Sequence, residues 1–80
     1  MPTYITLEIM KYQFLHFVRI EKKPKTEVWS CRNNKTGDQL GVVEWYAPWR
    51  QYCFFPTVQA VYSAGCLEDI AAFIKYLKGR

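Results

Sequence analysis

The chain has 80 residues, which fits one domain near the lower limit for folding on a single hydrophobic core. Half of the residues are hydrophobic and 18% are Phe, Trp or Tyr, a composition that excludes an intrinsically disordered chain. The 11 Lys and Arg residues outnumber the 7 Asp and Glu residues, and the net charge of +4 modestly favours anionic partners such as nucleic acid. The apolar runs are far shorter than the roughly 20 residues of a membrane-spanning helix, so no membrane partner is expected.

The N-terminal segment, residues 1–9, does not have the pattern of a signal peptide. It lacks a basic start, a long apolar centre and a small-residue cleavage site, so we expect a cytoplasmic protein. We predict a single domain over residues 1–80. In one interpretation, Met10 is an alternative translation start, residues 1–9 are an upstream extension, and the core of the domain spans residues 11–78.

Period-two alternation of apolar side chains over residues 11–21 predicts a first strand with apolar groups on both faces. Residues 22–25 contain three lysines and a proline, which end this strand in a solvated turn. A second strand is expected over residues 26–32. The Asn- and Gly-containing segment 33–38 then predicts a hairpin that leads into a third strand over residues 39–46.

The second half of the sheet is less regular. Residues 47–49 predict a turn, and a fourth strand over residues 50–55 ends at Pro56. Residues 57–62 form either a fifth short strand or an extended crossing. Gly41, inside the third strand, marks either a bulge or a close approach of backbone.

Apolar residues at helical spacing predict an amphipathic helix at the C-terminus. Glu68 and Asp69 are placed in its first turn and Lys75 and Lys78 in its last, an order that complements the helix dipole. Strands followed by one helix give an α+β fold, a small antiparallel meander of four or five strands packed against this helix. The apolar stripe consists of Leu67, Ile70, Ala71, Phe73, Ile74 and Leu77.

Ser63 is the candidate N-cap of the helix, a position near Gly65 is the alternative, and Gly79 suits the residue after the helix. The core is expected to combine the helix stripe with one face of each strand. Alternation alone does not decide which face that is. The expected core residues are Phe14 or Phe17, Val18, Trp29, Val43, Trp45, Phe54, Leu67, Ile70, Phe73, Ile74 and Leu77.

The segment from Glu44 to Phe55 is the strongest candidate for a binding surface, because six of its twelve residues are aromatic. Exposed rings beside an arginine can stack on unpaired bases, and they are equally typical of anchors in protein interfaces. In a third interpretation the rings only pack in the core, with Arg50 over Trp49 or Trp45 as a cation–π pair. The candidate residues are Tyr46, Trp49, Arg50 and Tyr52.

Lys22, Lys23 and Lys25 form a second candidate surface, where their amines would contact phosphates. The alternative is a solvated turn whose charges protect a sheet edge. Arg19 and Arg32 would extend this basic area only if the strand register brings them to it. Glu21 and Glu27 are close in sequence and weaken its field.

Metal, cofactor and catalytic sites are not expected. His16 and the three cysteines, Cys31, Cys53 and Cys66, are widely spaced, whereas structural zinc sites usually use two close ligand pairs. The odd number of cysteines favours reduced thiols. A Cys–His nucleophile would need His16 within hydrogen-bond reach. Glu68 and Asp69 diverge by about 100° on a helix, so they do not make a paired carboxylate site.

Residues 40–56 and 66–70 carry a recognisable pattern. It combines a Leu-Gly-x-x-x-Trp-Tyr strand and a Trp-Arg-x-Tyr-Cys-Phe-x-Pro strand with a Cys-Leu-x-Asp-Ile helix start. In this pattern the chain resembles a group of short uncharacterised bacterial and prophage-type proteins over roughly residues 14–77. The resemblance implies a bacterial or phage origin and a cytoplasmic setting, and it supplies no catalytic or ligand residues.

The leading functional prediction is a small non-enzymatic module that binds nucleic acid through the aromatic residues and the three lysines. The alternative is a protein-interaction adaptor or inhibitor of phage type, or a homodimer formed through the free face of the sheet. A small enzyme is the third and weakest prediction, and it would require a deep pocket that contains His16 and a cysteine.

Overall fold

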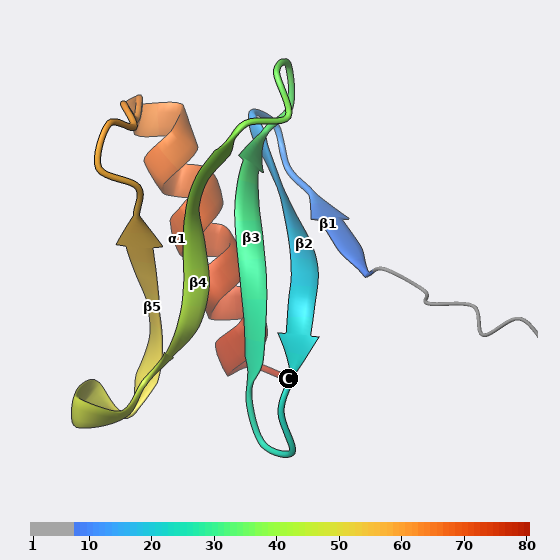
Figure 1. Cartoon of the computed structure of the whole chain (residues 1–80), viewed down its shortest axis with the longest axis vertical. Helices are drawn as coiled ribbons and strands as arrows, with labels where there is room; N and C mark the ends of the chain where they lie inside the picture. The colour runs from blue at the N-terminus through green and yellow to red at the C-terminus, as the bar shows by residue number, and fades with distance from the viewer. Residues whose placement is uncertain (1–7) are drawn as a thin grey trace, which may run out of the picture.

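The computed structural model describes residues 8–80. They form the predicted α+β fold, a five-stranded antiparallel sheet followed by one helix that covers one face of the sheet (Figure 1). The sheet is a meander in the order β1-β2-β3-β4-β5, so each strand pairs with the next one in the chain. No helix in this range is long and apolar enough to cross a membrane. The strands are β1 (Ile9–Lys11), β2 (Leu15–Lys22), β3 (Glu27–Asn33), β4 (Gln39–Tyr46) and β5 (Gln51–Pro56), and the helix is α1 (Ala64–Lys78).

The prediction of one continuous first strand over residues 11–21 is wrong. The chain turns at residues 12–14, where the Tyr12 N–H bonds the Leu15 carbonyl at 2.8 Å, and it thereby separates β1 from β2. Asp69 of the helix fixes this turn, because its Oδ2 accepts the backbone N–H groups of Phe14 at 2.8 Å and Leu15 at 3.2 Å. Ile9, assigned above to an upstream extension, and Met10, the alternative start, therefore both belong to the sheet, and residues 1–7 of that extension lie outside the described range.

The fifth strand is β1 rather than residues 57–62. Residues 57–62 leave the sheet after Pro56 and cross toward the helix without forming a strand. The Thr57 N–H, at 2.9 Å, and the Tyr62 hydroxyl both donate to the carbonyl oxygen of Leu40, which holds this crossing against β4. Residues 57–62 are therefore a crossing rather than a strand, but they are not extended throughout, because residues 58–59 form a turn.

The helix begins and ends close to the predicted positions. Ser63 is the N-cap, and its hydroxyl accepts the Cys66 N–H at 3.2 Å. Because the helix begins at Ala64, Glu68 and Asp69 lie beyond its first turn, contrary to the prediction, whereas Lys75 and Lys78 do lie in the last turn. Gly79 ends the helix with φ −85°, so it does not use the left-handed conformation for which glycine is favoured.

The core lies between the helix and the sheet. Phe73 is fully buried, stacks on Phe17 at 4.1 Å between ring centroids, and meets Trp29 edge-on at 4.9 Å. Phe54 and Ile74 pack against this core while partly buried. The central buried cluster consists of Leu15, Phe17, Trp29, Cys31, Val43, Ile70, Phe73 and Leu77.

Three of the expected core residues, Val18, Trp45 and Leu67, are not in the core, and of the alternatives Phe14 and Phe17 it is Phe17 that lies there. Val18 lies on the opposite face of the sheet, because its neighbours Leu15 and Phe17 set the parity of β2. Phe14 is in the turn before β2, where its ring packs on Gly65, and it is exposed. Trp45 is 41% exposed at the edge of the core, and Leu67 is 53% exposed at the margin of the helix stripe.

Gly41 fulfils both roles considered for it. It lies beside the register shift between β3 and β4, and it also permits a close approach of β5. A Cβ at this position would lie 2.5 Å from the ring of Phe54 and 2.6 Å from the backbone carbonyl oxygen of Phe55. The bare backbone of Gly41 thus lets the Phe54 ring cover β4 on the helix side of the sheet.

Candidate functional site

Two turns of the sheet and the end of the helix lie at the same end of the molecule (Figure 1). Alternate turns of a meander fall on one side, which brings the β2–β3 turn near η1, the short 3-10 helix Ala47–Trp49 between β4 and β5. The C-terminus of α1 lies at this end too. We call it the basic end and define it by one exposed indole and six cationic side chains: Trp49, Lys22, Lys23, Lys25, Arg50, Lys78 and Arg80.

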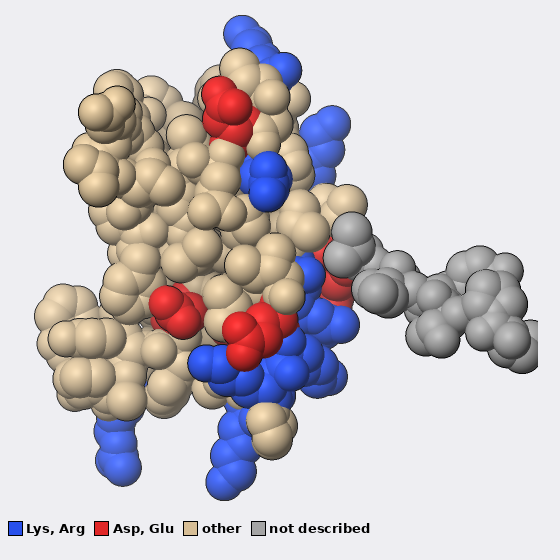
Figure 2. All heavy atoms as spheres, viewed as in Figure 1, with Lys and Arg blue, Asp and Glu red and all other residues tan. Residues whose placement is uncertain are grey.

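The basic end thus holds six of the 11 Lys and Arg residues of the chain. Figure 2 shows blue side chains gathered around the β2–β3 turn and below the β4–β5 turn, with acidic groups above them. Uncharged atoms cover most of the sheet face in this view. The net charge of +4 is therefore concentrated by the topology rather than spread evenly over the surface.

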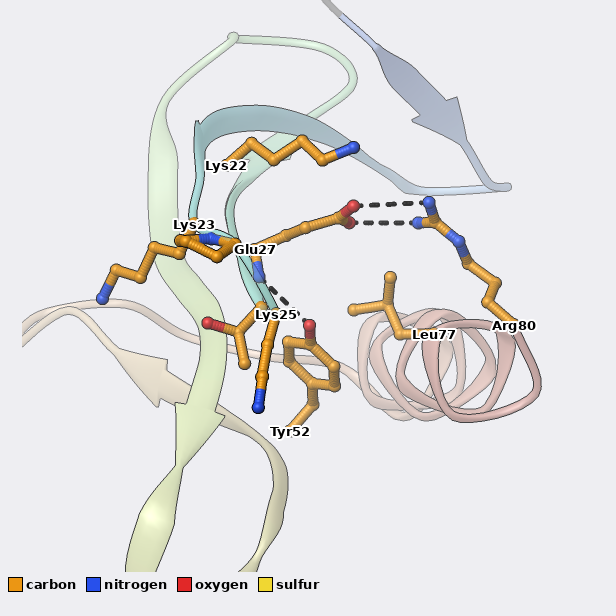
Figure 3. Close-up of a pocket in the computed structure, with 9 residues that line it drawn as sticks. Lys22, Lys23, Lys25, Glu27, Tyr52, Leu77 and Arg80 are labelled. Atoms are coloured by element: carbon orange, nitrogen blue, oxygen red, sulfur yellow. Dashed lines mark hydrogen bonds and ion pairs between the residues drawn. The ribbon is translucent and has the colours of Figure 1, made fainter.

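A polar pocket of about 310 Å³ opens at the basic end, between the β2–β3 turn and the last turn of the helix. In Figure 3, Lys22 extends past Glu27 toward Arg80, Lys25 runs beside Tyr52, and Lys23 points away from the other two. The three amines fan out and do not converge on one point. This divergent arrangement of amines suits several phosphates along an extended backbone better than a single enclosed anion. The lining residues are Lys22, Lys23, Pro24, Lys25, Thr26, Glu27, Tyr52, Leu77 and Arg80.

Glu27 is the acidic residue of this pocket, and its charge is already compensated. Its carboxylate accepts hydrogen bonds from the indole N–H of Trp29 at 2.9 Å and from two nitrogens of Arg80 at 3.0 and 3.3 Å. Arg19 lies at 3.5 Å. Burial alone would raise the pKa of Glu27, but the bond from Trp29 and the charges of Arg80 and Arg19 outweigh burial and lower it. The ionised Glu27 therefore orders Arg80 and offsets its charge, whereas Lys22, Lys23 and Lys25 form no ion pair within the described residues.

Tyr52 joins this polar pocket to a second, apolar one of about 270 Å³. Its hydroxyl accepts the backbone N–H of Glu27 at 3.1 Å, and its ring meets Trp45 edge-on at 5.5 Å. Cationic side chains border the apolar pocket, so a flat ring entering it would lie close to positive charge. The lining residues are Trp45, Arg50, Gln51, Tyr52, Ile74, Leu77 and Lys78.

The tip between β4 and β5 presents the most exposed aromatic ring of the site. Pro48 lies within η1, and Arg50 ends the turn with φ 52°, its N–H bonding the Ala47 carbonyl at 3.1 Å. Trp49 is 66% exposed and meets Tyr46 edge-on at 5.2 Å. One face of the indole is thus free to stack on a planar partner while Tyr46 supports its edge.

The structure divides the seven predicted site residues into two groups. Lys22, Lys23, Lys25 and Tyr52 line the polar pocket, and Arg50 joins Tyr52 at the apolar one. Tyr46 and Trp49 form a separate pair on the other side of the sheet, because alternation sends Tyr46 and Trp45 to opposite faces. The cation–π contact within residues 8–80 joins Arg80 to Tyr76, at 5.5 Å, so the predicted Arg50 contact with Trp49 or Trp45 is wrong.

Sequence reasoning missed three residues of the site, Arg80, Lys78 and Trp45. The two cations follow the helix stripe and reach the pockets only because the helix ends beside the β2–β3 turn. Conversely, Arg19 and Arg32 do not extend the basic area. Arg19 is held by Glu8 at 2.9 Å and by Glu27, while Arg32 lies at the opposite end of β3 and donates to the Gly37 carbonyl at 2.9 Å.

His16 and the cysteines do not meet in a common site. His16 Nδ1 lies 2.8 Å from the side-chain oxygen of Asn34 on the face away from the helix, whereas Cys31 is buried on the helix side. Burial raises the pKa of the Cys31 thiol to about 12. Among residues 8–80, no group of three or more His, Cys, Asp or Glu residues could hold a metal ion. Neither pocket contains His16 or a cysteine.

Comparison with known proteins gives no further guidance, because no family model, curated protein or solved structure matches the chain. The resemblance to short bacterial and prophage-type proteins therefore stays a prediction.

Proposed function

We propose that the protein is a small non-enzymatic binding module whose basic end binds single-stranded nucleic acid. The observation that carries this proposal is the gathering of six cations and the exposed Trp49 at one end of a domain whose net charge is only +4. A single-stranded nucleic acid lying across this end would place its phosphates near Lys22, Lys23 and Lys25. An unpaired base would stack on Trp49.

The shape of the site favours single strands over a duplex. The site is a short rim with two pockets, and the hairpins behind its turns are part of a five-stranded sheet rather than a free ribbon that could enter a major groove. Stacking on an indole also requires a base that is free of its partner. The divergent lysines supply point charges along a backbone, so recognition would depend little on sequence.

The test is fluorescence anisotropy with a labelled single-stranded oligonucleotide at several salt concentrations. Trp49→Ala should weaken binding about 5- to 140-fold, since one stacked base contributes roughly 1–3 kcal/mol. Replacing Lys22, Lys23 and Lys25 by alanine should reduce the slope of log affinity against log salt by about two. The matched control is Lys35→Ala, an exposed lysine in the Asn33–Asp38 turn at the opposite end, which should change neither quantity.

Two results would refute the proposal. One is the absence of binding at low salt to single strands of DNA and of RNA. The other is binding that responds to Lys35→Ala as strongly as to the changes at the basic end, because the charge would then act without a defined site.

A protein partner is the second candidate function, either for an adaptor or for an inhibitor of phage type. The exposed Trp49 contacts the half-buried Tyr46, and the exposed Arg50 follows Trp49 in the chain; Trp, Tyr and Arg are the residue types that anchor protein interfaces. A protein captured from nuclease-treated lysate in a complex that resists salt, and lost on Trp49→Ala, would favour this candidate over nucleic acid.

A further inference from the structure

The face of the sheet opposite the helix, which we call the open face, bears an apolar row across all five strands. The register aligns one residue from each strand, and four of the five are hydrophobic. Ile9 is 56% exposed and Phe55 is 36% exposed at the two ends of the row. Figure 2 looks onto this face and shows it largely uncharged. From β1 to β5 the row is Ile9, Val18, Ser30, Val42 and Phe55.

Charged rows of opposite sign flank the apolar row. On the side of the basic end, Glu21 and Glu44 lie on either side of Val28 of β3. On the far side, Lys11 and Arg32 lie on either side of His16 of β2. Counting its Lys, Arg and Glu side chains, the open face therefore carries two positive charges on one side of its apolar row and two negative charges on the other.

We infer that the open face is the interface of a homodimer, in which a second copy of the chain packs on this face with its basic end pointing in the opposite direction. We call this packing the end-over-end arrangement. A two-fold axis along the apolar row stacks the two rows on each other and reverses the strand direction. Arg32 of each copy then faces the partner copy between Glu21 and Glu44. An axis along the strands would instead set like charges opposite each other, which is unfavourable.

The charged residues are not already paired with each other inside one copy. Within residues 8–80 the ion pairs are those of Arg19 and Arg80, and Arg32 and Glu44 lie in rows on opposite sides of the apolar row. The Arg32 guanidinium uses one nitrogen to reach the Gly37 carbonyl and keeps other N–H groups for a partner. The positive and negative rows lie at similar distances on opposite sides of the apolar row. The face of one copy is therefore complementary in charge to the same face of a second copy.

The size of the face predicts a weak dimer. Five strands about 4.8 Å apart and about six residues long at roughly 3.3 Å each give a face of roughly 480 Å² per copy. The two copies together would bury about 1,000 Å², near the lower limit for specific interfaces. We therefore expect dissociation constants on the order of 10–100 µM, with a monomer in dilute solution.

This inference goes beyond the proposed function and is compatible with it. Trp49 and the lysines of the β2–β3 turn lie beyond the flanking row of Glu21 and Glu44, outside the proposed interface. The end-over-end arrangement places the two basic ends at opposite ends of the dimer. Each dimer would then offer two independent binding sites for single-stranded nucleic acid.

The experiment is sedimentation equilibrium of the full chain from about 5 µM to 1 mM, without nucleic acid. The mean mass should rise toward twice that of the monomer. Phe55→Lys, at an exposed end of the row, should weaken association at least tenfold, whereas Lys35→Ala should leave it unchanged. A chain that stays monomeric at 1 mM, or a dimer that tolerates Phe55→Lys, would overturn the inference.

Charge reversal tests the orientation. Arg32→Glu and Glu44→Arg should each weaken the dimer about three- to tenfold, and the double variant should recover most of the loss, because the pair is restored across the two-fold axis. Circular dichroism confirms that each variant is folded, and Lys11→Glu with Glu21→Lys offers a second such pair if one variant does not fold. Failure of both double variants to recover would overturn the end-over-end arrangement.

Discussion

Replacing Glu27 with alanine removes the acceptor of the Trp29 indole N–H, a donor on a fully buried side chain. An unsatisfied buried donor costs about 1–3 kcal/mol. The ion pairs of Glu27 add less, because the side chains of Arg80 and Arg19 are 36% and 23% exposed and can be rehydrated. We expect Glu27→Ala to lower the free energy of unfolding by about 2–3 kcal/mol, and the melting temperature by about 10–20 °C.

The Glu27→Gln variant separates the contribution of the hydrogen bond to stability from that of the charge. The amide oxygen still accepts the Trp29 N–H while the ion pairs are lost, so the free energy of unfolding should fall by only about 1 kcal/mol. The pKa of Glu27 is lowered in the folded protein, so the stability that its charge contributes is fully present above the unfolded-state value near 4.5. It is lost as the pH falls through the folded-state pKa. The difference between the wild type and Glu27→Gln should therefore be constant at pH 6–8 and shrink below pH 4.5.

Urea unfolding followed by tryptophan fluorescence measures both quantities, at pH 7 and at pH 3.5. A Glu27→Ala variant within 0.5 kcal/mol of the wild type would refute the structural role assigned to this carboxylate. A stability gap between the wild type and Glu27→Gln that widens as the pH falls would refute the assigned sign of the pKa shift.

Two further predictions concern Gly41 and Cys31. Gly41→Ala should lower the free energy of unfolding by about 1–3 kcal/mol, because its Cβ would lie 2.6 Å from the Phe55 carbonyl oxygen. Gly79→Ala is the control in urea unfolding, since its Cβ would meet nothing within 3.6 Å, and equal effects would contradict the packing described. Iodoacetamide at pH 8.5 should label the partly buried Cys53 in the native protein and reach Cys31 only after unfolding, because Cys31 is buried and its pKa is raised to about 12. Mass spectrometry identifies the labelled residue, and fast native labelling of Cys31 would contradict its burial.

Local signals predicted the second, third and fourth strands and the helix to within a few residues. The Asn33–Asp38 turn fixes the ends of β3 and β4, and the Ser63 cap with a 3.6-residue apolar period fixes the helix. These signals depend on residues close together in the chain, so a single sequence contains them.

The break between β1 and β2 was not predictable in the same way. Apolar alternation continues across residues 12–14, and the turn there is held by Asp69, 55 residues away from Phe14. The exposure of Trp45 has a similar origin, because an apolar pocket stays open between Trp45 of β4 and Ile74 of the helix. Both features depend on where the helix lies on the sheet.

The candidate site was partly predictable for the same reason. The lysine cluster and Trp49 are visible in the sequence because they occupy turns marked by Pro24 and Pro48. That these turns share one end with Arg80 follows from the meander order and from the direction of the helix. The polar pocket itself depends on the Glu27–Arg80 pair, which joins residues 53 positions apart.

Mapping of backbone amide chemical shifts on addition of a single-stranded oligonucleotide tests the central claim most directly. At low salt, we predict the largest changes in residues 22–26, 47–52 and 78–80, together with the indole N–H of Trp49. Residues 33–38, at the opposite end, should not change. Shifts centred on residues 33–38, or spread evenly over the sheet, would contradict a nucleic-acid site at the basic end.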